Sequence, residues 1–258
     1  MRNLRRWCSA VLLLPLLAAP ALGQVVTKDI TLKSGDEEIK GFLAIPEGKG
    51  PFPAVVVIQE WWGLNDWIKE NAKRLAAKGY VALAPDLYRG KVTDDMKVAA
   101  QLVKGLPPDR ALRDLQASVA YLAHMKNVRK DRIGSIGWCM GGGYSLQLAL
   151  ANHTLKACVI CYGRVITDQD KLKPLAARVL GIFGEEDKGI PAKSVREFEE
   201  ALKNGGHKVE RIHIFADAGH GFMRPTNGAS KNPAYRETQA NQAWVAIEEF
   251  FAKTLSRK

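Results

Sequence analysis

The sequence predicts an α/β fold in which helices cover both faces of a mostly parallel sheet. Short apolar segments typical of strands alternate with segments of helical periodicity along the 258 residues. The unbroken apolar run at residues 54–58 (Ala-Val-Val-Val-Ile) is typical of a parallel strand buried on both faces. A strand, a glycine-rich turn and a helix follow one another around residues 137–143, and such turns place reactive side chains at the carboxyl end of a parallel strand.

The first 23 residues have the pattern of a secretory signal peptide. Three arginines precede a short apolar core, and small residues lie before a cleavage site after Gly23. An uncleaved membrane anchor is the alternative, but the apolar core is short and is interrupted by Pro15. We therefore expect an exported protein, periplasmic or secreted. It is expected to form one domain over residues 24–258, with no stable membrane insertion after signal cleavage.

The net charge of the chain is +11, yet the composition gives no sign of a nucleic-acid partner. Basic residues are interspersed with acidic ones, as at residues 69–74, and no basic run is interleaved with aromatic residues. We expect a solvated basic surface, a small-molecule substrate, no metal or other cofactor, and a monomer or dimer.

Three cysteines follow the signal segment, and an odd number argues against a disulfide framework. Cys158 and Cys161 fall in a predicted strand, where residues three apart point to opposite faces. Buried structural cysteines are therefore favoured over a redox pair.

The amino-terminal part predicts strands and one helix. Residues 24–46 alternate apolar and polar around a Ser-Gly-Asp turn, which indicates an antiparallel hairpin at a sheet edge. After the strand at 54–58, Asn65 is expected to cap a helix that ends at Gly79, and a strand follows at 80–84.

The rest of the chain continues the alternation of strands and helices. Residues 87–108 form a looser excursion with a short helix near 96–103, and Asp109 is expected to cap the next helix. We then expect strands at 132–136, 157–162, 178–184 and 208–215, and helices at 144–151, 194–204 and 233–255.

The glycine-rich turn has the form of a nucleophile elbow with Cys139 at its centre. Gly137 and Gly141 lie two residues to either side, where larger side chains would collide in the strained turn. The elbow directs its central side chain toward a helix N-terminus, which favours the thiolate, the nucleophilic form of cysteine. The alternative is an ordinary glycine-rich turn around a buried cysteine.

Asp187 and His220 are the expected acid and base that act with Cys139. Each follows a predicted strand, and the order nucleophile, acid, histidine is that of the α/β-hydrolase triad. Asp187 is favoured over its neighbours Glu185 and Glu186 because its acidic loop ends at an Ile-Pro pair that opens the next helix. Among the five histidines, His220 alone follows a strand in a glycine-flanked turn.

Four segments together resemble the dienelactone hydrolase family of carboxymethylenebutenolidases. They are Gln-Glu-Trp-Trp-Gly-Leu-Asn at 59–65, Gly-Tyr-Val-Ala-Leu-Ala-Pro-Asp-Leu-Tyr at 79–88, Gly-Trp-Cys-Met-Gly-Gly at 137–142 and Ala-Gly-His-Gly-Phe at 218–222. The resemblance covers about residue 28 to the C-terminus. It implies a single-domain α/β-hydrolase fold and hydrolysis of a small ester or lactone through a cysteinyl acyl-enzyme.

The resemblance also implies further site residues. Glu60 matches a glutamate that interacts with the nucleophilic cysteine at rest and helps to form the thiolate when substrate binds. The backbone N–H groups of Trp61 and Met140 are expected to form the oxyanion hole. Trp61 and Trp62 are expected to form an aromatic wall of the substrate pocket, with Trp62 as the substrate-binding residue; the alternative is that one of them belongs to an aromatic cluster in the core. Arg224 and Arg89 match arginines that bind a substrate carboxylate.

Two other functions remain open from the sequence. The hydrolase scaffold could be catalytically retired and act as a ligand-binding module. The chain could instead be a thiol redox protein that uses Cys158 and Cys161. The complete triad order favours the hydrolase, because a retired site usually loses one member.

Overall fold

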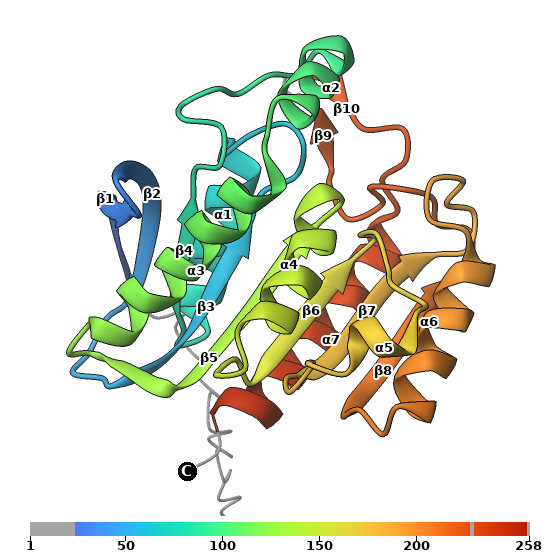
Figure 1. Ribbon diagram of the computed structural model, residues 1–258. Coiled ribbons are helices and arrows are strands. Elements are labelled where there is room, and N and C mark those ends of the chain that lie inside the picture. Colours follow the sequence, from blue (N-terminus) through green and yellow to red (C-terminus); the bar gives the residue numbers. More distant parts are fainter. Residues whose placement is uncertain (1–23, 228–229, 257–258) are drawn as a thin grey trace, which may run out of the picture.

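The computed structural model describes residues 24–227 and 230–256 and shows one eight-stranded sheet with helices on both faces (Figure 1). The predicted signal segment, residues 1–23, lies outside the described residues. The strand order is β1-β2-β4-β3-β5-β6-β7-β8, and all pairings from β4 to β8 are parallel. The strands are β1 (Val25–Ser34), β2 (Glu37–Pro46), β3 (Phe52–Ile58), β4 (Val81–Pro85), β5 (Val128–Trp138), β6 (Ala157–Cys161), β7 (Arg178–Gly184) and β8 (Val209–Phe215).

The edge hairpin and the buried central strand are confirmed. β1 and β2 pair antiparallel at one edge of the sheet, and β2 joins β4 antiparallel. β3 lies between β4 and β5, and its residues 54–58 are fully buried. Helices cover both of its faces, which explains why no polar residue interrupts this strand.

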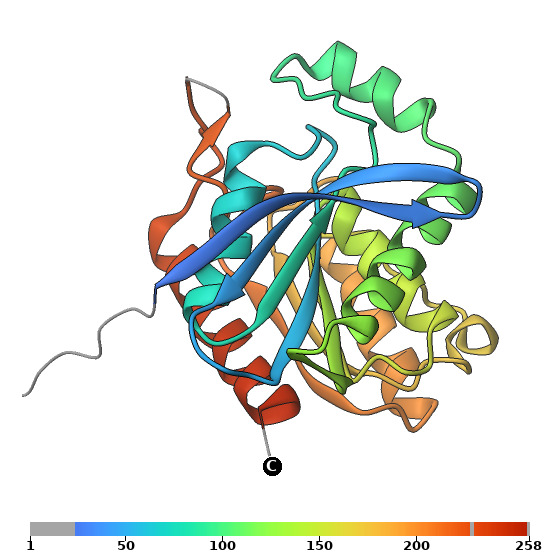
Figure 2. The same ribbon diagram turned by 90° about the vertical axis from the view of Figure 1, so that its left-hand side faces the viewer.

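The helices form two layers. α3 (Pro108–His124), α4 (Met140–Ala151) and α6 (Ala192–Asn204) bury their apolar side chains in a core on one face, together with the short α5 (Gln169–Leu172). α1 (Asp66–Ala77) and α7 (Glu237–Leu255) close the core on the other face. Figure 2 shows this layering from the side of the edge hairpin. No helix in the described ranges is long and apolar enough to cross a membrane.

Several expected element ends were wrong. Asp109 does not cap α3, which begins at Pro108, with Pro107 at the cap position and no capping side chain. Asp109 lies instead in the first turn, where its charge favours the positive end of the helix. α4 begins at Met140 rather than at 144, and α7 begins at Glu237 rather than at 233.

Two projecting features lie at the end of the molecule where the parallel strands end. α2 (Met96–Lys104) was predicted as a short helix in the excursion after β4. The small hairpin of β9 (Thr226–Asn227) and β10 (Ser230–Lys231) was not predicted. Figures 1 and 2 show both features rising above this edge of the sheet.

Candidate active site

The turn between β5 and α4 holds Cys139 in a left-handed backbone conformation, with φ 56° and ψ −118°. A non-glycine residue rarely adopts a positive φ, and such strain is concentrated at functional sites. A Cβ atom on Gly137 would overlap the carbonyl oxygen of Gly141. A Cβ atom on Gly141 would overlap the carbonyl oxygens of Ile58 and Gln59. The chain therefore has the predicted elbow geometry, with Cys139 at its centre.

The loop after β7 brings Asp187 to the ring of His220. Asp187 Oδ2 lies 2.7 Å from His220 Nδ1. Asp187 Oδ1 accepts hydrogen bonds from the amides of Gly189 (2.8 Å) and Ile190 (2.9 Å), which fix the carboxylate. Burial alone would raise the pKa of Asp187, but His220 and these two amides lower it. The rival acids, Glu185 and Glu186, are exposed, whereas Asp187 is buried.

The ring of His220 interacts with both the Asp187 carboxylate and the Cys139 thiol. The His220 side chain is 42% exposed. Partial burial would lower the pKa of His220, but the hydrogen bond to Asp187 and the interaction with Cys139 raise it to about 10. The edge of the His220 ring packs against Tyr162, with centroids 5.3 Å apart. The three predicted triad residues therefore lie together.

The two amides expected to form an oxyanion hole belong to Trp61 and Met140. Trp61 follows β3, and Met140 is the first residue of α4, so its N–H has no acceptor within the helix. Within the described part of the chain, neither amide has a hydrogen-bond acceptor. Two free backbone donors at neighbouring strand ends are a suitable arrangement for binding negative charge.

Glu60 is buried at the carboxyl end of β3, and its partners are Arg224 and Tyr162. Glu60 Oε2 lies 2.9 Å from Arg224 Nε, but the N–H is not directed at the oxygen. The Tyr162 hydroxyl donates to Glu60 Oε1 at 3.4 Å. Burial raises the pKa of Glu60, although Arg224, His220 and Tyr162 lower it. Glu60 is therefore ion-paired with Arg224 and hydrogen-bonded by Tyr162, and within the described part of the chain it makes no hydrogen bond with Cys139.

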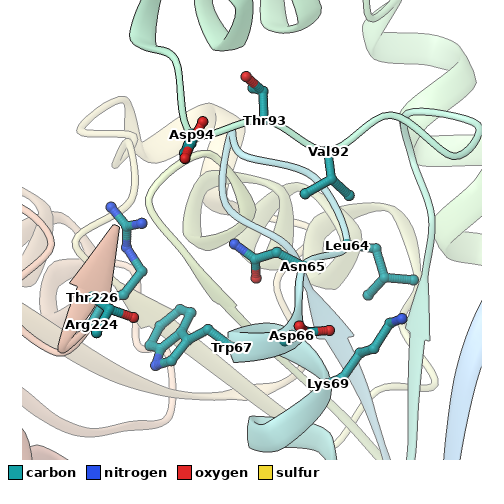
Figure 3. A pocket seen from close by; sticks show the side chains of 10 residues that line it. All are labelled: Leu64, Asn65, Asp66, Trp67, Lys69, Val92, Thr93, Asp94, Arg224 and Thr226. Carbon is teal, nitrogen blue, oxygen red and sulfur yellow. The ribbon is translucent and has the colours of Figure 1, made fainter. Parts of the chain in front are cut away.

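Arg224 connects this cluster to a cavity. Its guanidinium lies over the ring of Trp62, 4.8 Å from the ring centroid. Trp62 is only 5% exposed, so its ring mainly supports Arg224. Trp61, which is partly exposed, packs edge-to-face on Trp62. Arg224 also lines a cavity of about 510 Å³ together with Trp67, the segment 92–94 and Thr226 (Figure 3).

The structure does not bring Arg89 to this site. Its guanidinium pairs with Asp114 and with Glu37, both at 2.7 Å. The side chain of Asp114 is fully buried and needs a counter-charge, so it holds Arg89 near the edge hairpin. The expectation that Arg89 binds a substrate carboxylate therefore has no support in its position.

Sequence reasoning missed the tyrosines around the thiol. Tyr162 directly follows β6, at the same edge of the sheet, and its φ of 36° is another positive value. The Tyr88 hydroxyl donates to Met140 Sδ at 3.3 Å. Burial and the nearby Cys139 sulfur raise the pKa of Tyr88 above its usual range. Their positions in the sequence could have indicated them, because Tyr88 follows β4 and Tyr162 follows β6 at the carboxyl ends of these strands, where sites in parallel sheets lie.

Cys158 and Cys161 are unsuited to redox chemistry. They are fully buried, free, and on opposite faces of β6, because Cys158 packs in one core and Cys161 in the other. Burial raises the pKa of Cys158 to about 12, and it also raises the pKa of Cys161. The reactive thiolate form is therefore suppressed at both positions.

Comparison with known proteins identifies the family. The model of the dienelactone hydrolase family matches residues 39–255. The chain belongs to the dienelactone hydrolase family. A protein of Methylorubrum extorquens named as a candidate carboxymethylenebutenolidase is 32% identical over 241 residues, which is 88% of this chain and 81% of that protein. One of Escherichia coli K12 with the same name is 31% identical and covers 93% of this chain and 96% of its own length.

Solved structures agree with this assignment. A dienelactone hydrolase-like promiscuous phosphotriesterase from metagenomic libraries is 26% identical, with a TM-score of 0.81, over 90% of this chain and 99% of that one. The predicted α/β-hydrolase fold and family resemblance are confirmed. This member of the dienelactone hydrolase family is a hydrolase of the ester and lactone class, with a small-molecule substrate.

Proposed function

We propose that this dienelactone hydrolase family member cleaves small esters or lactones through Cys139, His220 and Asp187. The observation that carries the proposal is the hydrogen-bonded pair of Asp187 and His220, 2.7 Å apart, whose ring reaches the thiol on the strained elbow. A nucleophile, a base and a group that orients the base have the roles that covalent acyl transfer requires.

The reaction would proceed in two halves. The proton of the Cys139 thiol passes to His220, whose raised pKa favours the resulting pair of thiolate and imidazolium, and the sulfur attacks the carbonyl carbon of the substrate. The amides of Trp61 and Met140 stabilise the negative oxygen, and His220 returns its proton to the departing alkoxide oxygen. Water then attacks the thioester carbon and gives a proton to His220. The carbon–sulfur bond breaks, the acid leaves, and the thiol is restored.

Glu60 would assist the first proton transfer. Its buried carboxyl has a raised pKa, so it accepts a proton more readily than an exposed carboxylate does. Its pairing with Arg224 is close but poorly directed. A substrate that draws Arg224 toward the cavity would free Glu60 to accept the thiol proton first and pass it to His220, so the same proton later reaches the leaving group. Arg224, rather than Arg89, is then the group that binds an anionic substrate.

The names of the relatives indicate the substrates to test first. The Methylorubrum and Escherichia proteins are named as candidate carboxymethylenebutenolidases, and the metagenomic protein of known structure is named as a phosphotriesterase. For this chain we propose ester and lactone substrates, with the enzyme exported as its first 23 residues predict.

Asp187→Asn tests the proposed base. The uncharged amide would no longer hold the pKa of His220 near 10, so the His220 imidazolium would lose its proton at lower pH. Without that proton the leaving group is not protonated. The alkaline limb of kcat/KM should therefore move to lower pH by about one unit or more. The measurement is the pH profile of aryl ester hydrolysis, with the His220 ring titrated by NMR.

Glu186→Gln is the matched control, because it removes an adjacent carboxylate that is exposed. Its pH profile should equal that of the wild type. An unchanged alkaline limb in Asp187→Asn, or an equal shift in Glu186→Gln, would remove Asp187 from the proposed triad.

Glu60→Gln tests the assisting carboxyl separately. Glutamine keeps the shape and an acceptor for Tyr162 but cannot take the thiol proton, so kcat should fall by about 100-fold with little change in KM. Alkylation of Cys139 at alkaline pH should continue, since hydroxide then removes the proton. Glu47→Gln, at an exposed position, is the control. If Glu60→Gln kept the wild-type kcat, Glu60 would not take part in the proton transfer. That result would not contradict the proposed triad.

A further inference from the structure

Exposed apolar side chains are concentrated on one short segment. Six large apolar side chains are exposed in the described residues, and four of them lie between residues 92 and 103. These four define the α2 patch: Val92, Met96, Val98 and Val103, of which Met96 is 66% exposed. Such a concentration of apolar surface marks an interaction site more often than single exposed residues do.

Most of helix α2 has no packing partner. Ala99 is its one buried residue, although the helix is strongly amphipathic. Met96, Ala100 and Val103 are spaced four and three residues apart, so they line one flank of the helix, and all three are exposed. The Asp95 side chain caps the helix by accepting from the amides of Lys97 and Val98.

Lysines border the apolar flank. Lys97 and Lys104 each follow a residue of that flank by one position, and both are exposed, as is Lys91 before the helix. The acidic residues of the segment are Asp94 and Asp95, and Asp95 is engaged in capping. An apolar stripe with lysines at its margin is the pattern of a helix that lies in the headgroup region of a membrane.

The patch lies beside the candidate site. α2 rises above the carboxyl ends of the strands (Figures 1 and 2). The segment leading into it, residues 92–94, lines the cavity that Arg224 also lines (Figure 3). A surface that contacts α2 would therefore face the mouth of this cavity.

We propose that the α2 patch docks this enzyme on an anionic lipid surface. Met96 and Val103 would enter the headgroup region, while Lys91, Lys97 and Lys104 meet lipid phosphates. A second copy of the chain fits less well. A two-fold contact would place these lysines against those of the partner copy, and one nine-residue helix offers little of the area of a stable dimer.

Vesicle co-sedimentation tests the proposal. The protein should bind vesicles of equal parts phosphatidylglycerol and phosphatidylcholine, bind pure phosphatidylcholine about tenfold more weakly, and lose binding as salt rises. The double variant Met96→Asp with Val103→Asp should weaken binding at least about tenfold. Val245→Asp, at a 55% exposed valine of α7, is the matched control and should bind like the wild type.

Several outcomes would overturn the proposal. One is that the wild type binds neither vesicle; another is that the α2 variant binds as the wild type does, or that Val245→Asp weakens binding equally. A wild-type dimer that the α2 variant converts to a monomer in sedimentation velocity would identify a second copy as the partner. Hydrolysis of a water-soluble ester and the melting temperature should be unchanged in the α2 variant. A fall in either would show a structural or catalytic role instead.

Discussion

Cys139→Ala is expected to lower kcat/KM for a small aryl ester by about 10⁴-fold or more, because it removes the atom that forms the acyl-enzyme. Cys139→Ser keeps a nucleophile on the elbow but replaces the thiol with a hydroxyl, which ionises far less readily. Serine is therefore expected to recover only a small part of the lost rate. Initial rates with one activated ester and one lactone measure both variants.

Cys158→Ala is the matched control for loss of a thiol. Cys158 is buried away from the elbow, where its sulfur lies 3.5 Å from Ser145 Oγ. The variant should keep its turnover and lose a little stability. If Cys139→Ala kept wild-type rates, Cys139 would not be the nucleophile, and the retired binding scaffold would become the better explanation of the elbow.

Gly141→Ala is expected to destabilise the fold by about 3 kcal/mol or more, at the upper end of the effect of overpacking. The new Cβ atom would overlap the carbonyl oxygens of Ile58 and Gln59, and backbone atoms cannot move aside as a flexible side chain can. For a chain of this size the melting temperature should fall by roughly 6 °C or more. Thermal unfolding followed by circular dichroism gives the value.

Gly143→Ala is the control in the same helix. Its Cβ atom would lie 3.4 Å from the nearest atom, the amide nitrogen of Arg164, so it fits with little movement. Alanine is also the better helix former, by about 1 kcal/mol. The melting temperature should therefore stay level or rise. Equal destabilisation by the two substitutions would show that the elbow glycines are not required for close approach of the backbone.

The elbow and the triad order could be predicted because their requirements are local. The strained turn needs glycine at fixed offsets from Cys139, and the acid and the histidine follow strands in a set order. The two opposite faces of β6 likewise follow from strand geometry, which placed Cys158 and Cys161 in separate cores. Each of these features is determined by spacing along the chain.

The surroundings of the site could not be predicted because they depend on distant partners. Arg89 was expected at the substrate, but buried Asp114, 25 residues away, binds it instead. The cluster of Glu60, Tyr162 and Arg224 joins three strand-end segments, and no local pattern signals it. The early start of α4 has the same cause. Its glycines disfavour a helix in isolation but permit close packing, since a Cβ on Gly142 would lie 2.7 Å from the Cys161 oxygen.

The most direct test of the proposed covalent mechanism is intact-mass spectrometry of the enzyme quenched in acid during turnover of an activated acetyl ester. We predict that one acetyl group accumulates, that peptide mapping places it on Cys139, and that it decays when the ester is exhausted. Hydrolysis at full rate with no covalent acetyl-enzyme, or with the acetyl group on another residue, would contradict this mechanism.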